Sequence, residues 1–167
     1  MRREATKKTG RPTPTRNKPE RPRDALGRPQ PWGTPNALVL EDYDALPLEE
    51  NHRLAIGHFD AGRFFPAHEA WETAWKQARD TADAEFFKGL SQLGAGYVHL
   101  LRGNAHGAVT LLRRATSRIS RYAVGHRGVD TRAVCASAEA DAAAVESGAL
   151  VPGEGARHGA PRLGAEG

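Results

Sequence analysis

The side chains best suited to chemistry lie in the stretch FFPAHEAWETAWK. His68 and Glu72 are four residues apart, so a helix would place them on one face, where the carboxylate can orient the imidazole. Trp71 and Trp75 accompany this face, and large indole rings favour at least partial burial. The spacing therefore predicts that His68, Glu72 and the adjacent Glu69 lie against the core of the protein.

A second group of unusual residues lies in the next segment of the chain. Gln92 and His99 are seven residues apart, so a helix would place them along one line. Glycines recur at the same spacing, although each interior glycine costs a helix about 1 kcal/mol relative to alanine. We expect another helix to cross close to the backbone at these close-packing glycines, which are Gly89, Gly96 and Gly103.

If the crossing helix is the one that carries His68, polar side chains of both helices meet in one cluster inside the protein. The candidate catalytic residues of this cluster are His68, Glu69, Glu72, Gln92 and His99. As a metal site, His68 and Glu72 would bind a divalent ion such as Zn, Fe or Mn, and His99 or Glu69 would complete the ligand set.

Two further interpretations of the same cluster stay open. In a hydrolase-like enzyme, His68, Glu72 and His99 would supply acid and base groups, supported by Glu69 and Gln92. Alternatively, the cluster is a buried hydrogen-bond network that fixes the register of the helices. The chain has no glycine-rich phosphate loop, dinucleotide fingerprint or nucleophile elbow, so no cofactor-binding residues are assigned.

The elements that must position these residues are helices. Apolar residues at spacings of three and four, together with glycine and proline at segment ends, predict helices over about 47–61, 66–79, 81–102, 105–122 and 131–146. Short connections favour antiparallel neighbours, which predicts an all-α fold, an up-and-down antiparallel bundle of about five helices. The expected core residues are Trp71, Trp75, Phe86, Leu90, Leu93, Tyr97, Leu111, Leu112 and Ile119.

Other polar residues are expected to face water. His52 and His58 are six residues apart, which puts them on opposite faces of the first helix and predicts surface positions. His106 and His126 are also expected to face water. The charged stripe of the fourth helix is expected to be solvated; its members are Arg114, Arg118 and Arg121.

The two ends of the chain differ in composition from the middle. Residues 1–36 hold ten Lys and Arg against three Asp and Glu, together with seven prolines, which predicts a disordered basic leader. Residues 37–146 are expected to form the helical domain, and the Gly- and Ala-rich residues 147–167 a disordered tail. The leader therefore carries a charge of +7 and the rest of the chain −3, which together give the net +4. Weak nucleic-acid contact through residues 2–28 is one expected role for the leader.

Composition also limits the location of the protein. A single cysteine, Cys135, excludes an internal disulfide and favours a cytoplasmic location, with an inert thiol in an alanine-rich helix. No apolar run approaches the roughly 20 residues that a membrane-spanning helix needs, so no membrane association is expected.

The segment from about residue 59 to 122 resembles the domain-of-unknown-function 309 family of small all-helical bacterial and archaeal proteins. The resemblance rests on FDAGRFFPAHEAWETAWK and on EFFKGLSQLGAGYVHLLRGNAHGAVTLLRRA. It implies a compact helical bundle and brings no established reaction, substrate or cofactor. The polar positions characteristic of the family would be His68, Glu69, Glu72, Gln92 and His99.

Three functions from different classes follow from these observations. The leading hypothesis is a non-catalytic module that binds a protein partner or forms a homo-oligomer. The second is a metal-dependent or acid/base enzyme that uses His68, Glu72 and His99. The third is a nucleic-acid accessory protein that acts through the basic leader.

Overall fold

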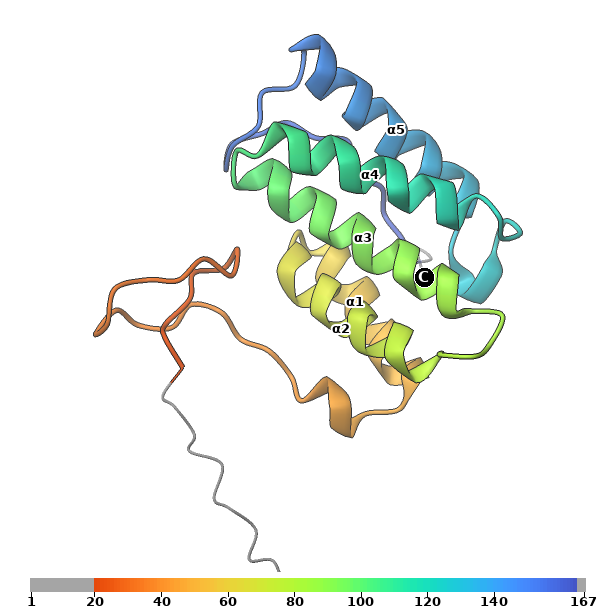
Figure 1. The fold of residues 1–167 in the computed structure, drawn as a ribbon, viewed down its shortest axis with the longest axis horizontal. Coiled ribbons are helices and arrows are strands. Elements are labelled where there is room, and N and C mark those ends of the chain that lie inside the picture. The colour runs from red at the N-terminus through yellow and green to blue at the C-terminus, as the bar shows by residue number, and fades with distance from the viewer. Residues whose placement is uncertain (1–19, 165–167) are drawn as a thin grey trace, which may run out of the picture.

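The computed structural model describes residues 20–164, which fold into five α-helices and two short 3-10 helices (Figure 1). The α-helices are α1 (Leu48–Asp60), α2 (Phe64–Gln77), α3 (Ala84–Leu101), α4 (Ala105–Ile119) and α5 (Thr131–Ser147). Their ends differ by no more than three residues from the expected helices. Residues 20–164 contain an isolated bridge between Arg23 and Pro29 but no β-strand, so the prediction of an all-α fold is confirmed.

Local signals in the sequence determine where several of these helices begin. The Asn104 side chain accepts a hydrogen bond from the Gly107 amide at the start of α4, and Asp130 accepts one from the Ala133 amide at the start of α5. Such caps satisfy amide groups that have no partner within the helix. Pro66 lies in the first turn of α2, where its missing N–H is tolerated.

Each helix packs against the next helix in the chain, because the connections between them are short (Figure 1). α3 lies at the centre, with α2 against one side and α4 against the other. α3 is accordingly the helix with the most buried residues, among them Phe86, Leu90 and Tyr97. Any group on α2 that faces α3 is therefore held by the core of the protein.

Seven of the nine expected core residues are fully buried, and the other two are not. Trp75 and Leu111 are only partly buried. The Lys88 ammonium lies 5.1 Å from the centre of the Trp75 ring, so Trp75 forms a half-exposed contact between α2 and α3. Helical spacing predicted that both residues lie near the apolar face of their helix, but it could not predict how much of each side chain the neighbouring helices cover.

The first helix is covered on two sides, which corrects the prediction that His52 and His58 are surface residues. His52 is 7% exposed, and its ring accepts a hydrogen bond from the Trp71 indole at 3.1 Å and contacts the Arg127 carbonyl at 3.0 Å. His58 is 9% exposed and lies 3.0 Å from both carboxylate oxygens of Glu41. Segments outside the helix cover the second face, and periodicity within one helix cannot reveal them.

The described parts of the two chain ends also pack against the helices. Leu150 and Leu163 are buried, and Asp60 accepts hydrogen bonds from the amides of Leu163 and Gly164. The leader is bound at Leu26, whose carbonyl accepts a hydrogen bond from the guanidinium of Arg102 at the end of α3. Residues 20–36 and 148–164 thus differ from the disordered ends expected from composition, whereas residues 1–19 and 165–167 lie outside the described part of the chain.

Candidate functional site

Three predicted site residues come together in the middle of α2. The ligand atoms of His68, Glu69 and Glu72 all lie within 4.8 Å of one another. His68 Nε2 is 3.4 Å from Glu72 Oε2 and 3.8 Å from Glu69 Oε1. The side chains are 24% exposed for His68 and 36% for each glutamate, so this triad lies at the edge of the core rather than inside it.

The orientation of the His68 ring is set by the neighbouring helix. His68 Nδ1 lies 2.9 Å from the carbonyl oxygen of Ser91 and 2.9 Å from the Ser91 hydroxyl oxygen, both on α3. When Nδ1–H donates to the carbonyl, the lone pair of Nε2 points toward the two glutamates. A second ring nitrogen bonded to a backbone carbonyl is the usual arrangement of a metal-binding histidine. Ser91 is therefore part of the site, and its spacing in the sequence gave no sign of it.

The two helices approach closely at this point because α3 has a glycine there. A Cβ atom on Gly94 would lie 3.1 Å from the backbone nitrogen of His68 and 3.2 Å from its Cα. Gly94 thus provides the close approach to α2 that was expected at other glycines. It brings the Ser91 backbone within reach of the imidazole.

The predicted close-packing glycines have other neighbours. A Cβ on Gly89 would lie 2.8 Å from Ile119 Cγ1, and one on Gly96 would lie 2.8 Å from Leu112 Cδ2. Both glycines therefore face α4 and not α2. Gly103 has a φ of +85° with no atom within 4 Å of its Cβ position, so it ends α3 instead of packing against a helix.

Gln92 and His99 do not join the triad. The Gln92 side-chain oxygen accepts a hydrogen bond from Arg118 on α4 at 3.1 Å. His99 Nδ1 is 3.0 Å from the Asn104 side-chain nitrogen, and burial, with the nearby Arg102 and His68, lowers the pKa of His99. The single five-residue cluster inside the bundle is therefore not formed.

A second histidine–carboxylate network lies on α1, where the sequence gave no prediction of one. The Tyr43 hydroxyl donates to Glu41 at 2.6 Å, His58 contacts the same carboxylate, and the Arg63 guanidinium donates to His58 Nδ1 at 2.9 Å. Burial acts to raise the pKa of Glu41, but the hydrogen bonds from Tyr43 and His58 outweigh it and hold this pKa below its usual value. These groups satisfy one another, so the network stabilises the fold.

The other polar residues singled out in the sequence lie apart from the triad. His106 is exposed, as expected, whereas His126 is half-buried with Nε2 2.8 Å from the Asp83 carboxylate, which corrects its expected position. Arg118 also departs from a solvated stripe, because it pairs with Glu85 at 3.0 Å. Cys135 is half-buried, and burial raises the pKa of its thiol, as an unreactive cysteine requires.

The triad has the spacing of a known metal-binding motif. In H-E-x-x-H on a helix, two histidines four residues apart bind zinc. Here His68 and Glu69 occupy the first two places, and Glu72 takes the place of the second histidine. Lys76 lies 3.6 Å from the other oxygen of Glu72, so one carboxylate oxygen faces the histidine and one faces a cation on the surface.

Within residues 20–164, no helix combines the length and apolar character that a bilayer crossing requires.

Comparison with known proteins gives one match. Residues 52–111 match the model of the family described as Domain of unknown function (DUF309). None of the curated proteins and none of the solved structures compared with the chain matches it. The matched segment begins in α1 and ends in α4, and it contains the triad and Ser91. The resemblance seen in the sequence is confirmed for residues 52–111, which match the DUF309 family model.

Proposed function

We propose that His68, Glu69 and Glu72 bind a divalent metal ion and that the protein is a metal-dependent enzyme of the hydrolase type. The observation that carries the proposal is the spacing of the three side chains. In a tetrahedral site with bonds of about 2.1 Å, neighbouring ligand atoms are about 3.4 Å apart. His68 Nε2 lies 3.4 Å from Glu72 Oε2 and 3.8 Å from Glu69 Oε1, which is the separation of ligands around an ion.

The surroundings of the triad suit such an ion. One imidazole nitrogen and two carboxylates are a ligand set for Zn, Mn or Fe, whereas thiolate-rich sites select Cu(I), Zn or Fe–S clusters. The positive charge of an ion would also offset the repulsion between two carboxylates and an imidazole lone pair. Three protein ligands leave further positions open, and the partial exposure of all three side chains lets water reach them.

The residues have distinct parts in this proposal. Ser91 orients the His68 ring through Nδ1, and Gly94 allows α3 to come close enough for that contact. A bound divalent ion would make water a stronger nucleophile by lowering its pKa. His99, which the sequence suggested as a third ligand, is left out because the ligand atoms that lie within 4.8 Å of one another are those of His68, Glu69 and Glu72.

Metal binding by purified, chelator-treated full-length protein tests the proposal. Isothermal titration with ZnCl2 or MnCl2 should show one ion per chain, and an ion concentration of 100 times the dissociation constant should stabilise the fold by about 2.7 kcal/mol. Glu72→Gln should weaken binding at least tenfold. Ser91→Ala should weaken it less, because it removes the Ser91 hydroxyl but leaves the backbone carbonyl that accepts from His68 Nδ1. His106→Ala is the matched control, because His106 is exposed and lies outside the triad.

The alternative, in which the cluster is only a hydrogen-bond network that fixes the helices, gives a different result in the same assay. If the triad only holds α2 against α3, His68→Ala lowers the melting temperature equally with and without metal, because it leaves the Ser91 groups without their partner. Absence of saturable metal binding by the wild-type protein would overturn the proposed function.

A further inference from the structure

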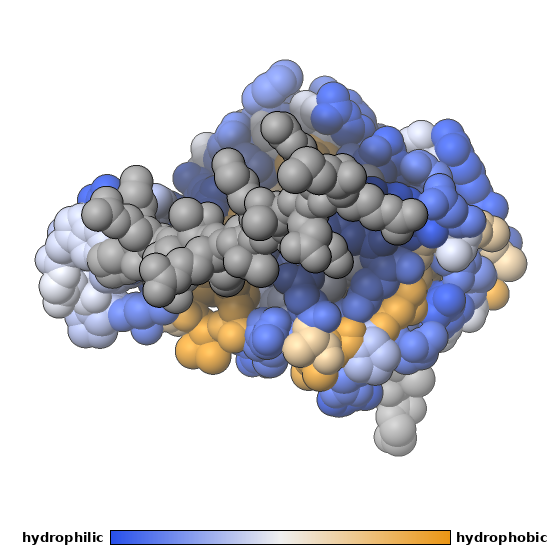
Figure 2. Space-filling view, turned by 60° about the horizontal axis from the view of Figure 1, so that its bottom comes forward, coloured by the Kyte–Doolittle hydropathy of each residue, from blue (hydrophilic) through white to orange (hydrophobic). Residues whose placement is uncertain are grey.

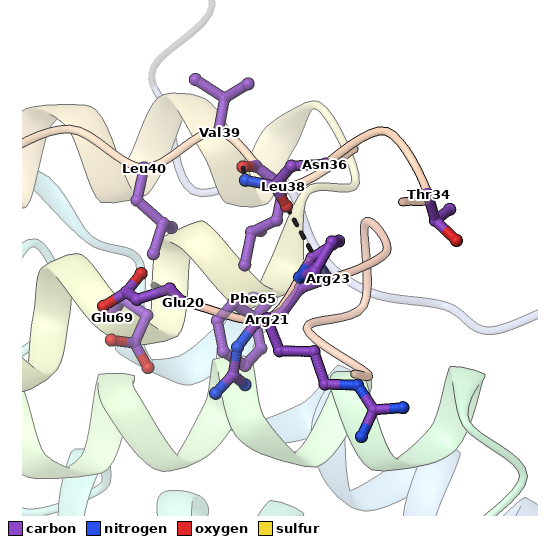
Figure 3. Close-up of a pocket in the computed structure, with 11 residues that line it drawn as sticks. Glu20, Arg21, Arg23, Thr34, Asn36, Leu38, Val39, Leu40, Phe65 and Glu69 are labelled. Atoms are coloured by element: carbon purple, nitrogen blue, oxygen red, sulfur yellow. Dashed lines mark hydrogen bonds between the residues drawn. The ribbon is translucent and has the colours of Figure 1, made fainter. Parts of the chain in front are cut away.

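A hollow lies between the leader and the first turns of α2 (Figure 3). It has a volume of about 820 Å³ and is lined by residues 20–23, Thr34 and Asn36 of the leader, by residues 38–40 that follow it, and by Phe65 and Glu69. The leader is held in place by two contacts next to this hollow. Gly27, with a φ of +76°, packs on the Phe65 ring, where a Cβ would lie 2.4 Å from the nearest ring carbon, and Arg102 donates to the Leu26 carbonyl.

One wall of the hollow is an extended segment in which the backbone groups of Val39 and Leu40 are free to bind. Residues 35–42 form neither helix nor turn. Leu38 is buried and anchors the segment, whereas Val39 is 77% and Leu40 is 42% exposed. With the other residues of 20–164, the backbone N–H and C=O groups of Val39 and Leu40 make no hydrogen bonds. Free backbone groups beside exposed apolar side chains are the features that an added extended peptide uses.

The charges around the hollow are separated. Figure 3 shows the carboxylates of Glu20 and Glu69 close together at one end, while the guanidinium groups of Arg21 and Arg23 extend toward the other. Each guanidinium is held by a carbonyl, since Arg21 donates to the Gln30 oxygen at 2.7 Å and Arg23 to the Gly27 oxygen at 2.9 Å. Neither arginine pairs with a carboxylate among residues 20–164.

We infer that this hollow binds an extended, acidic segment of a partner protein that also carries large apolar side chains. The apolar side chains would cover Val39 and Leu40, which are both exposed. Figure 2 shows that hydrophobic residues also gather in patches on a largely hydrophilic face of the molecule. The acidic side chains would pair with Arg21 and Arg23, and the repulsion from Glu20 and Glu69 at the opposite end fixes the direction of the segment. The net positive charge of residues 1–36 favours encounter with an acidic partner.

This inference assigns a surface to the partner-binding hypothesis; that surface shares Glu69 with the proposed metal site, but none of the residues replaced in the test. Val39 and the two arginines are not in contact with His68, so their replacement should leave metal binding unchanged. Glu69 belongs to both the hollow and the triad and is therefore not used in the test.

A displayed library of random twelve-residue peptides, selected against the full chain, tests the inference. The selected peptides should be enriched in Asp and Glu beside Leu, Ile, Phe or Trp. Fluorescence polarisation with one selected peptide should show an affinity loss of at least tenfold for Val39→Glu. The matched control is Val151→Glu, at a valine that is 73% exposed in the C-terminal segment and should bind like the wild type.

A charge-matched pair of variants separates specific contact from general attraction. Arg21→Gln combined with Arg23→Gln should weaken binding at least fivefold and reduce its salt dependence, whereas Arg79→Gln combined with Arg132→Gln should not. Circular dichroism and the melting temperature should match the wild type for all variants, because the replaced side chains are exposed.

Three outcomes overturn the inference. The first is a selection that returns no peptides, or peptides without acidic and apolar enrichment. The second is an equal effect of Val39→Glu and Val151→Glu. The third is displacement of the peptide by single-stranded DNA at equal concentration of negative charge, which would favour the nucleic-acid hypothesis for the leader.

Discussion

The replacement of Gly96 by alanine tests the packing of the central helix most directly. A methyl group at Gly96 would lie 2.8 Å from Leu112 Cδ2, 2.9 Å from Leu112 Cγ and 3.2 Å from the Leu112 backbone nitrogen. Leu112 is fully buried, so its side chain has no free space into which it can move. The methyl group must therefore separate α3 from α4 or force Leu112 from its preferred rotamer.

The magnitude follows from two opposing effects. Alanine favours the helix by about 1 kcal/mol over glycine, and overpacking a well-packed core costs about 1–3 kcal/mol. Gly57→Ala on α1 is the matched control, because its Cβ position has no atom within 4 Å and only the helix preference changes. The free energy of unfolding of Gly96→Ala should therefore lie about 1–3 kcal/mol below that of Gly57→Ala.

Urea and thermal unfolding followed by far-UV circular dichroism measure this difference. In a chain of this length, each kcal/mol shifts the melting temperature by about 2–4 °C. Gly57→Ala should melt above the wild type, and Gly96→Ala at or below it. A double-mutant cycle with Leu112→Ala should show coupling of about 0.5–3 kcal/mol, because that change removes the atoms in conflict. A Gly96→Ala protein that is as stable as Gly57→Ala would refute the packing described here.

Two further predictions concern stability. Burial lowers the pKa of His52, so the neutral ring is favoured in the folded state. The stability that the buried neutral ring contributes is fully present above about pH 6.5, and it is lost as the pH falls from there toward the lowered pKa. The urea midpoint of the wild type should therefore fall between pH 7.5 and pH 5.5, and that of His52→Gln should fall less. An equal fall in the two proteins would mean that His52 is not buried. Removal of residues 149–167 should lower the unfolding free energy by about 2–4 kcal/mol, because Leu150 and Leu163 would no longer cover the core. Removal of residues 165–167 alone is the control, and equal melting of the two shortened chains would contradict the docking of this segment.

Much of the fold could be predicted because its signals are local. Asn104 and Asp130 cap helices through bonds to amides only three residues away, so the sequence contains both partners. The pairing of His68 with Glu72 is similarly local, since one turn of helix brings the two side chains together. These features depend on helical geometry, and helical geometry follows from the order of residue types.

The remaining features of the site depend on contacts between distant segments. Ser91 is twenty-three residues from His68, and no periodicity relates the two. The glycines of α3 follow a clear pattern, yet the pattern does not say which neighbour they face: Gly96 meets α4 and Gly94 meets α2. The leader looked unable to fold by itself, but it gains surface to pack on from Phe65 and Arg102.

The amino-acid sequence alone determined that this protein is helical, where its helices begin and end, and which side chains of α2 share a face, because these properties arise from interactions within about four residues. The tertiary structure decided that His68 is held by Ser91, that Gln92 bonds to Arg118 and His99 contacts Asn104, and that a hollow lies between the leader and α2. The physical reason is that helical periodicity fixes the direction of a side chain around its own axis, whereas the packing of the whole core chooses which neighbour that side chain meets.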